Sequence, residues 1–206
     1  MEKITKELFI GYLEELYSDA KCALNYNNDY ELLISIILSA QTTDKAVNNV
    51  TPALFERFKD LESLKNANLE EVEEIIKPLG LYKNKAKNII SASKSLVDHG
   101  YSTIPDDFDI LIKLDGVGRK TANVFLSEYL DKDTLGVDTH IERVSKRLGI
   151  ADKGDTVLLT EQKLKNFIQG YSSKKIHHMM IAFGRNKCSA KKPLCEKCKF
   201  KDCCNK

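Results

Sequence analysis

The sequence predicts an all-α protein, and its turn residues, apolar periodicity and charge content support that prediction. Among 206 residues there are only 10 glycines and 4 prolines, fewer than closely spaced strands and tight turns require. Apolar side chains recur at helical spacing along most of the chain. A content of 42% hydrophobic and 30% charged residues excludes a disordered or collagen-like chain. No apolar run approaches the roughly 18–20 residues of a membrane helix, so no membrane contact is expected.

The first two helices are predicted in the N-terminal 40 residues. An apolar stripe between Leu8 and Tyr17 marks the first helix, and five charged side chains among the first fourteen positions distinguish this segment from a signal peptide. The nearly continuous apolar run Leu32–Leu38 suits either a buried strand or a buried helix. Because no glycine or proline occurs between Gly11 and Pro52, we expect a helix.

Further apolar stripes bring the expected number of helices to about ten. A short link divides the stripe of residues 61–76, and another stripe covers residues 86–97. Helical spacing resumes in the second half of the chain, in residues 137–148, 157–168 and 176–183. No internal repeat or low-complexity linker separates these stripes.

The segment Leu111–Phe125 contains a candidate anion-binding turn. One helix is expected to end near Leu114, Gly116-Val117-Gly118 to form a tight turn, and a second helix to start at about Arg119. Two glycines let backbone N–H groups approach an anion, and a helix N-terminus adds its positive end. This combination predicts a phosphate-binding site without base readout. An ordinary helix–helix turn is the alternative.

Arg119 and Lys120 place two cations in the first turn of this second helix, where they oppose the helix macrodipole. A local rule broken in this way is typical of functional sites. Neighbouring positive charge and partial burial favour the neutral, nucleophilic amine of Lys120, whereas a surface lysine on a phosphate is the alternative. Asp138 is the candidate partner carboxylate, although its place before a predicted helix also fits an N-cap residue.

The cysteines predict a metal centre near the C-terminus. Five of the six fall in the last nineteen residues, and four have the spacing C-x6-C-x2-C-x5-C. Without a secretory segment, clustered thiols indicate a metal rather than disulfides. Either zinc or a four-iron cluster fits the four candidates Cys188, Cys195, Cys198 and Cys204. Cys203 is a spare thiol that can compete with the last ligand, and Cys22 is interpreted as a buried apolar residue.

The same tail carries most of the positive charge. The net charge of the whole chain is only +2, but residues 187–206 hold seven lysines against two acidic residues, a net +5. A basic tail on a mildly acidic body indicates an anionic partner, with a solvated tail as the alternative. Lys191 and Lys192 lie between the first two tail cysteines, where a metal-held loop would present them to phosphate.

Together these motifs resemble the endonuclease III family of the helix-hairpin-helix superfamily, whose members are DNA glycosylases and abasic-site lyases. The matching stretches occur in the family's order and cover residues 30–204. They are Leu38-Ser-Ala-Gln-Thr-Thr-Asp44, Gly80-Leu-Tyr82, Leu114-Asp-Gly-Val-Gly-Arg-Lys-Thr-Ala-Asn123, Val137-Asp-Thr-His-Ile141 and the four-cysteine tail. The tail spacing combined with the hairpin lysine is the most specific part of the resemblance.

The resemblance implies a role for each of these positions. Lys120 would attack the sugar C1′ and form a Schiff base, and Asp138 would assist that attack. Gln41 would fill the gap left by an extruded nucleotide, and Leu81, with Leu79 as a second candidate, would wedge the opposite strand. DNA contacts are expected from Gly116, Gly118, Arg119, Lys191 and Lys192, and the ligands of a [4Fe-4S] cluster would be Cys188, Cys195, Cys198 and Cys204.

The resemblance also implies an architecture and an activity. A central helical barrel with the hairpin, residues 22–132, would be joined by a second helical domain made of residues 1–21 and 133–206 with the cluster loop. The protein would remove oxidised pyrimidines from duplex DNA with damaged bases or abasic sites, and cleave the abasic strand by β-elimination. A monomer in the prokaryotic cytoplasm, associated with the nucleoid, is expected.

Several alternative functions are also considered, and one residue departs from the family's pattern. An adenine-mismatch glycosylase is similar in cluster and hairpin but lacks the lysine, and its further C-terminal domain is not expected here. A zinc-bound DNA-binding module would be colourless, and a uracil- or alkyl-base glycosylase of the same fold stays possible. Asp115 departs from the family's usual proline, and would weaken phosphate binding slightly unless it caps the following turn. A cluster in the tail would be structural or redox-active.

Overall fold

The computed structural model describes residues 3–205, and within that range it contains helices but no strand. The prediction of an all-α protein is confirmed. None of the helices in this range combines the length and apolar character needed to cross a membrane. The elements are α1 (Lys6–Tyr17), α2 (Asp29–Leu38), α3 (Asp44–Arg57), α4 (Leu61–Lys65), α5 (Leu69–Ile76), α6 (Tyr82–Asp98), α7 (Phe108–Leu111), α8 (Arg119–Leu130), α9 (Thr139–Arg147), α10 (Val157–Phe167), α11 (Ser173–Asn186) and the 3-10 helices η1 (Cys195–Lys197) and η2 (Lys201–Cys203).

Side-chain caps set the start of most helices. Nine of the described α-helices begin after a Ser, Thr, Asn or Asp residue whose side chain accepts a backbone N–H of the first turn, which satisfies donors that the helix itself leaves unpaired. These residues are Thr5, Asn28, Thr43, Asp60, Asn68, Asp107, Asp138, Thr156 and Ser172. α6 differs, because its N-cap position is Leu81, which has no side-chain acceptor.

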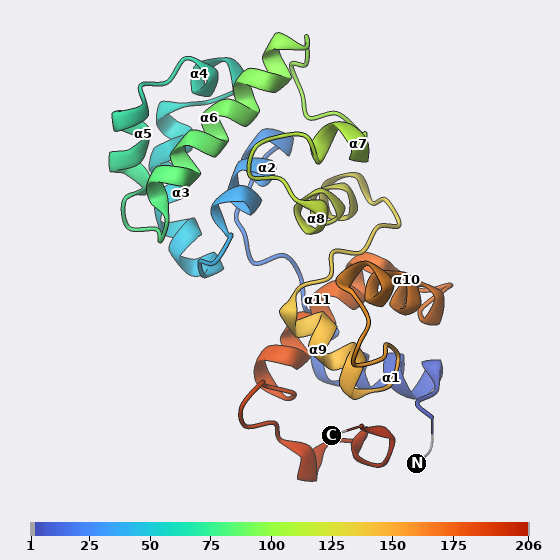
Figure 1. Cartoon of the computed structure of the whole chain (residues 1–206). Coiled ribbons are helices and arrows are strands. Elements are labelled where there is room, and N and C mark those ends of the chain that lie inside the picture. The colour runs from blue at the N-terminus through green and yellow to red at the C-terminus, as the bar shows by residue number, and fades with distance from the viewer. Residues whose placement is uncertain (1–2, 206) are drawn as a thin grey trace. The chain divides into compact units, whose positions relative to one another are not determined.

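The chain divides into two compact units, which are described separately. The hairpin unit is Cys22–Leu130 and contains α2 to α8. The split unit is Met1–Lys21 together with Asp131–Lys206, and contains α1 with α9, α10 and α11. Figure 1 shows the helices of both units.

The hairpin unit is organised around α2 and α6. Eight of the ten α2 residues are buried, in agreement with the predicted buried helix. α6 packs against α2, α4 and α5, and α8 packs against α2 and α7 (Figure 1). α2 therefore supplies the centre of this core, and α6 connects the N-terminal helices of the unit to the hairpin.

The split unit packs the N-terminal helix against the C-terminal part of the chain. α11 contacts both α1 and α9, and α10 contacts α9. The Phe200 ring lies 6.0 Å from the Phe9 ring, 4.9 Å from the Tyr12 ring and 5.5 Å from the Phe183 ring, measured between centroids. The cysteine-rich tail is therefore docked on α1 and α11 through one aromatic residue.

The sequence pattern assigned no helix to residues 44–57, where the structure has α3. The apolar stripe there is weak, and Pro52 lies inside the helix. Proline removes one backbone hydrogen bond and usually breaks a helix. α3 nevertheless continues, because Val47, Val50 and Leu54 are buried and the helix packs against α2 and α5.

The first helix of the predicted hairpin is shorter than expected. α7 ends at Leu111 rather than near Leu114. The N–H groups of Lys113 and Leu114 donate to the carbonyls of Ile110 and Leu111, both at 3.1 Å. The chain therefore leaves α7 through tight three-residue turns, a common way for helices to end.

Candidate functional site

The turn between α7 and α8 contains two glycines with different surroundings. Gly116 has a φ of +79°, and a Cβ there would lie 2.9 Å from Ile37 Cγ2 and 3.0 Å from Asn88 Nδ2. Only glycine fits a backbone that is both left-handed and this crowded. At Gly118, no described atom beyond the chain neighbours lies within 4 Å of the Cβ position. Packing therefore requires Gly116, whereas the space beside Gly118 is open to an approaching group.

Side chains of α6 and α7 brace this hairpin. Asp115 Oδ2 accepts a hydrogen bond from Ser91 Oγ of α6 at 2.6 Å. The carboxylate is thus held by α6, which corrects the capping of the following turn considered from the sequence. The Arg119 guanidinium lies 5.0 Å from the centroid of the Phe108 ring, a cation–π contact. Both contacts fix the residues that flank the glycine turn.

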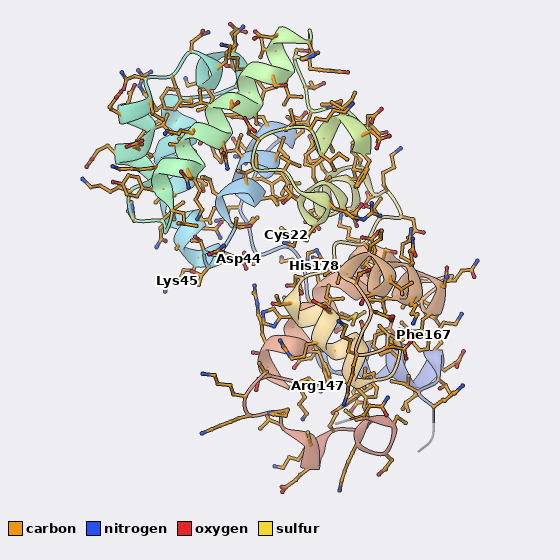
Figure 2. All side chains as sticks on the ribbon, in the orientation of Figure 1. Cys22, Asp44, Lys45, Arg147, Phe167 and His178 are labelled. Carbon is orange, nitrogen blue, oxygen red and sulfur yellow. The ribbon has the colours of Figure 1, made fainter. Side chains whose placement is uncertain are left out.

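Lys120 is the second residue of α8 and is half-buried. The first turn of α8 contains no acidic residue, so two cations stand at the positive end of the helix dipole. In the same unit, burial is the main cause that raises the pKa of the Cys22 thiol to about 11; the carboxylates of Glu128 and Asp44 add to the rise, and Lys120 opposes it. Cys22 and Asp44 can be found in Figure 2. The surroundings of Cys22 thus combine a thiol, two carboxylates and the catalytic candidate Lys120.

Gln41 and Leu81, which the resemblance assigns to the DNA stack, both have left-handed backbones. Their φ angles are +54° and +59°, and Asp131 is the only other non-glycine residue in residues 3–205 with a positive φ. Such backbones cost about 1–3 kcal/mol each and cluster at functional sites. Gln41 is exposed, and the apolar Leu81 side chain is 56% exposed. Leu79 is buried in the core, so of the two leucines only Leu81 is available as a wedge.

α6 carries residues that contact the candidate site and that do not stand out in the sequence. Lys85, Asn88 and Ser91 follow Leu81 at intervals of four, three and three residues, which places them on one face of the helix. This face contacts the Gln41 loop through Lys85 and the hairpin through Asn88 and Ser91. The helical spacing of these residues was the only signal for this face in the sequence. Neighbouring lysines made the segment resemble a solvated helix face.

Asp138 is the N-cap of α9 and binds with only one of its carboxylate oxygens. Oδ1 accepts the backbone N–H groups of His140 and Ile141, both at 2.8 Å. Among the described residues of the split unit, Oδ2 has no hydrogen-bond partner. One oxygen can therefore cap the helix while the other acts on a substrate. Because Lys120 belongs to the hairpin unit, the pairing of these two side chains stays a prediction.

The four tail thiols line one cavity of about 210 Å³ in the split unit. Cys203 is buried and does not line it, so this spare thiol is set apart from the other four. The remaining walls include apolar side chains such as Phe183, Leu194 and Phe200. The cavity-lining cysteines are Cys188, Cys195, Cys198 and Cys204.

The chemistry of this cavity fits a metal centre held by thiolates. Burial raises the pKa of Cys198 and of Cys204, and the neighbouring thiols add to the rise, so thiolates at this site need a bound cation. In residues 3–205, no three His, Cys, Asp or Glu side chains converge closely enough to hold one metal ion. The four thiols line one space, as the ligands of an iron–sulfur cube would.

Two arginines of α9 fix the loop that begins at the first tail cysteine. The guanidinium of Arg147 donates to Cys188 Sγ at 3.2 Å, to the Ser189 carbonyl at 2.9 Å and to the Ala190 carbonyl at 3.0 Å. Arg143 Nε donates to the Cys188 carbonyl at 3.2 Å. Arg147 is labelled in Figure 2. Neither arginine stands out in the sequence, where both resemble ordinary charges of an amphipathic helix.

Lys191 and Lys192 follow this loop and are exposed. The N–H of Lys192 donates to Ser189 Oγ at 3.3 Å, and the N–H of Leu194 donates to the Lys187 carbonyl at 2.9 Å. The two ammonium groups therefore project from a backbone that is tied down on both sides.

Comparison with known proteins places these features in a family. Residues 34–169 match the model of the HhH-GPD superfamily of base excision DNA repair proteins. The chain is 42% identical over 198 residues to endonuclease III of Bacillus subtilis (strain 168), covering 96% of this chain and 90% of that protein. A solved non-covalent endonuclease III–DNA complex matches with a TM-score of 0.92, and a trapped endonuclease III–DNA covalent intermediate, an estranged-adenine complex, with 0.90. Both are 42% identical, and each alignment covers 98% of this chain and 96% of the other.

Proposed function

The chain belongs to the HhH-GPD superfamily and, within it, to the endonuclease III family, and from this premise we propose that it removes oxidised pyrimidines from duplex DNA and cleaves the abasic strand. The observation that carries the proposal is the position of Lys120. This half-buried residue lies in the first turn of α8, directly after a glycine turn with open space beside Gly118. A nucleophile next to a phosphate-binding site suits a reaction at deoxyribose.

Lys120 supplies the covalent step in this proposal. Its Nζ forms a bond to C1′ of the sugar while the bond from C1′ to the damaged base breaks, and the base leaves with a proton. The C1′–O4′ bond then breaks and O4′ takes up a proton, which leaves a Schiff base between Nζ and C1′. Loss of a proton from C2′ and departure of the 3′ phosphate oxygen then cleave the strand. Water hydrolyses the Schiff base and restores the lysine.

Asp138 supports this step electrostatically in the proposal. A carboxylate close to C1′ stabilises the positive charge that develops as the base departs. Its Oδ2 is the oxygen assigned to this role, because Oδ1 is engaged by the N–H groups of α9. The cap also fixes the direction of the carboxylate.

Gln41 and Leu81 replace the stacking that is lost when the nucleotide leaves the duplex. Extrusion costs a few kcal/mol, and least for a damaged base. The exposed side chains at these two left-handed positions are suited to fill the vacated space. Gly116, Gly118, Arg119, Lys191 and Lys192 are assigned to the phosphate backbone, which positions the enzyme without reading sequence.

The proposed cofactor is a [4Fe-4S] cluster held by Cys188, Cys195, Cys198 and Cys204. The cavity that these thiols line and the contact from Arg147 to Cys188 Sγ support it. When bound, the cluster would order the basic loop for DNA contact. The proposed partner is duplex DNA with damaged bases or abasic sites, at the nucleoid, and the proposed state is a monomer.

Borohydride trapping on abasic-site duplex DNA tests the assignment of the nucleophile. Wild type is expected to form a covalent adduct, and Lys120→Ala to form none while still binding DNA, because only the amine can make a reducible Schiff base. Asp138→Asn keeps a helix-capping side chain and is expected to slow base release sharply without loss of folding. An adduct with Lys120→Ala would overturn the assignment, and base release without an adduct in wild type would indicate a monofunctional glycosylase.

A further inference from the structure

Lys85 is the one buried lysine or arginine among the described residues, with 3% of its surface exposed. Its Nζ donates to Thr42 Oγ1, and no carboxylate pairs with it in residues 3–205. Burial lowers the pKa of this amine. A buried ammonium without a counter-charge is costly, so its position calls for a structural reason.

The Nζ of Lys85 closes the turn that presents Gln41. The Thr42 hydroxyl that accepts from Lys85 donates in turn to the Ala40 carbonyl at 3.3 Å. Gln41 lies between these two residues, at the tip of the turn and with its φ of +54°. The hydrogen bonds from Lys85 through Thr42 to Ala40 therefore span the strained residue on both sides.

The backbone of Lys85 anchors the other strained residue. Its N–H donates to the Leu81 carbonyl at 3.0 Å, the first hydrogen bond of a helix whose N-cap has no side-chain acceptor. A left-handed residue persists only where its surroundings determine its conformation. One buried residue thus contacts Thr42, next to Gln41, with its side chain and the Leu81 carbonyl with its main chain.

We propose that Lys85 is a positioning residue that keeps Gln41 and Leu81 in register, so that both side chains enter the DNA stack together. The proposal rests on the proposed function, in which these two side chains replace an extruded nucleotide. Because Lys85 is buried, it contributes no DNA contact of its own. Its loss would therefore impair extrusion of the nucleotide and spare the covalent chemistry at Lys120.

Lys85→Met separates these two steps. Methionine has a similar length and fills irregular apolar space, so the helix is expected to fold. On a duplex that carries thymine glycol, base release is expected to fall about tenfold or more, because the strained backbone at Gln41 is then free to relax. On a single-stranded oligonucleotide with an abasic site, where there is no duplex stack to fill, borohydride trapping is expected to stay at the wild-type rate.

Fluorescence of 2-aminopurine placed beside an abasic analogue in a duplex measures extrusion directly. The rise on protein binding is expected to be smaller for Lys85→Met and for Thr42→Val than for wild type. If both residues act through one contact, the double variant is no worse than either single variant. Lys94→Met is the matched control, because Lys94 is exposed on the same helix and has no part in the proposed contact.

The experimental outcomes distinguish a failure of the positioning role of Lys85 from a failure of the proposed function. Wild-type base release from the duplex by Lys85→Met would overturn the positioning role. So would an equal loss of base release on the duplex and of borohydride trapping on the single strand. A wild-type protein that forms no borohydride adduct on abasic DNA would overturn the proposed function instead. Unfolding curves that match wild type keep Lys85→Met informative, and Thr42→Val supplies the same comparison without altering the buried amine.

Discussion

Gly116 and Gly118 are two residues apart, but the fold requires glycine only at position 116. Gly116 is left-handed and pressed against Ile37 and Asn88. Gly118 has neither a positive φ nor a close neighbour at its Cβ position. The open space beside Gly118 is consistent with the proposed approach of a DNA phosphate.

Alanine at each position is expected to separate folding from binding. Gly116→Ala should lower the free energy of unfolding by about 1–3 kcal/mol, because it adds a clash to a left-handed backbone. Gly118→Ala should stay within about 0.5 kcal/mol of wild type and weaken binding to duplex DNA. Urea denaturation and fluorescence anisotropy measure the two effects. Equal losses of stability in both variants would contradict this division.

At the scale of elements, Asp133 ties the segment before α9 to two helices of the split unit. Its Oδ1 accepts a hydrogen bond from the hydroxyl of Ser173, the first residue of α11. Its Oδ2 lies 3.4 Å from Lys165 Nζ of α10. The hydrogen bond from Ser173 is the main cause that lowers the pKa of Asp133. This carboxylate therefore links the segment that leads to Asp138 with α10 and α11.

Asp133 is expected to contribute to the acid sensitivity of the split unit. Because its folded-state pKa is lowered, the carboxylate stabilises the fold above the unfolded pKa of about 3.9, and the contribution is lost as the pH falls through the folded-state pKa. Three quarters of the side chain is exposed (75%), so solvent screening limits the effect to under about 1 kcal/mol. Asp133→Asn should unfold less steeply with acid than wild type in urea titrations from pH 7 to pH 2. An unchanged acid profile would show that Asp133 has no part in it.

The sequence predicted helices best where the apolar stripe was strong. The buried run of α2 and the start of α8 at Arg119 agree with the pattern. α3 escaped prediction because tertiary packing outweighs both Pro52 and a weak stripe. Local patterns cannot show which contacts a neighbouring element will supply.

Candidate site residues could be proposed from the sequence where chemistry imposes a residue type, as for the four thiols and the amine of Lys120. The supporting residues were not predictable, because their roles depend on burial and on backbone conformation. Lys85 resembles the exposed lysines around it, and only the fold shows that it is buried beneath the Gln41 turn. The roles of the arginines of α9 likewise follow from contacts with a loop about 40 residues away.

At the scale of the whole molecule, the proposed cluster concerns one unit more than the other. Its cavity lies in the split unit, where Phe200 joins the tail to α1 and α11 and Arg147 joins it to α9. The core of the hairpin unit has its own set of buried residues. Loss of the cluster should therefore loosen the tail and its helices before it affects the hairpin.

Iron removal is expected to have a regional effect. Hydrogen exchange should accelerate in residues 188–204 and at α9, because the thiol-lined cavity loses the proposed cluster. Exchange in α2 and α6 should be unchanged. Cys198→Ala should purify with little iron, whereas Cys203→Ala, the matched control outside the cavity, should retain about four iron ions per chain. A full iron content in Cys198→Ala, or uniform exchange across the chain, would contradict this view.

The discontinuous make-up of the split unit also has a consequence for biosynthesis. The ribosome releases α1 first, but the partners of α1 are residues of α11 and the tail, which emerge last. The contiguous Cys22–Leu130 segment can fold while the rest is still being translated. Until then the apolar stripe of α1 stays exposed, and assembly of the proposed cluster would need its last ligand, Cys204, so we expect maturation of the split unit to follow translation.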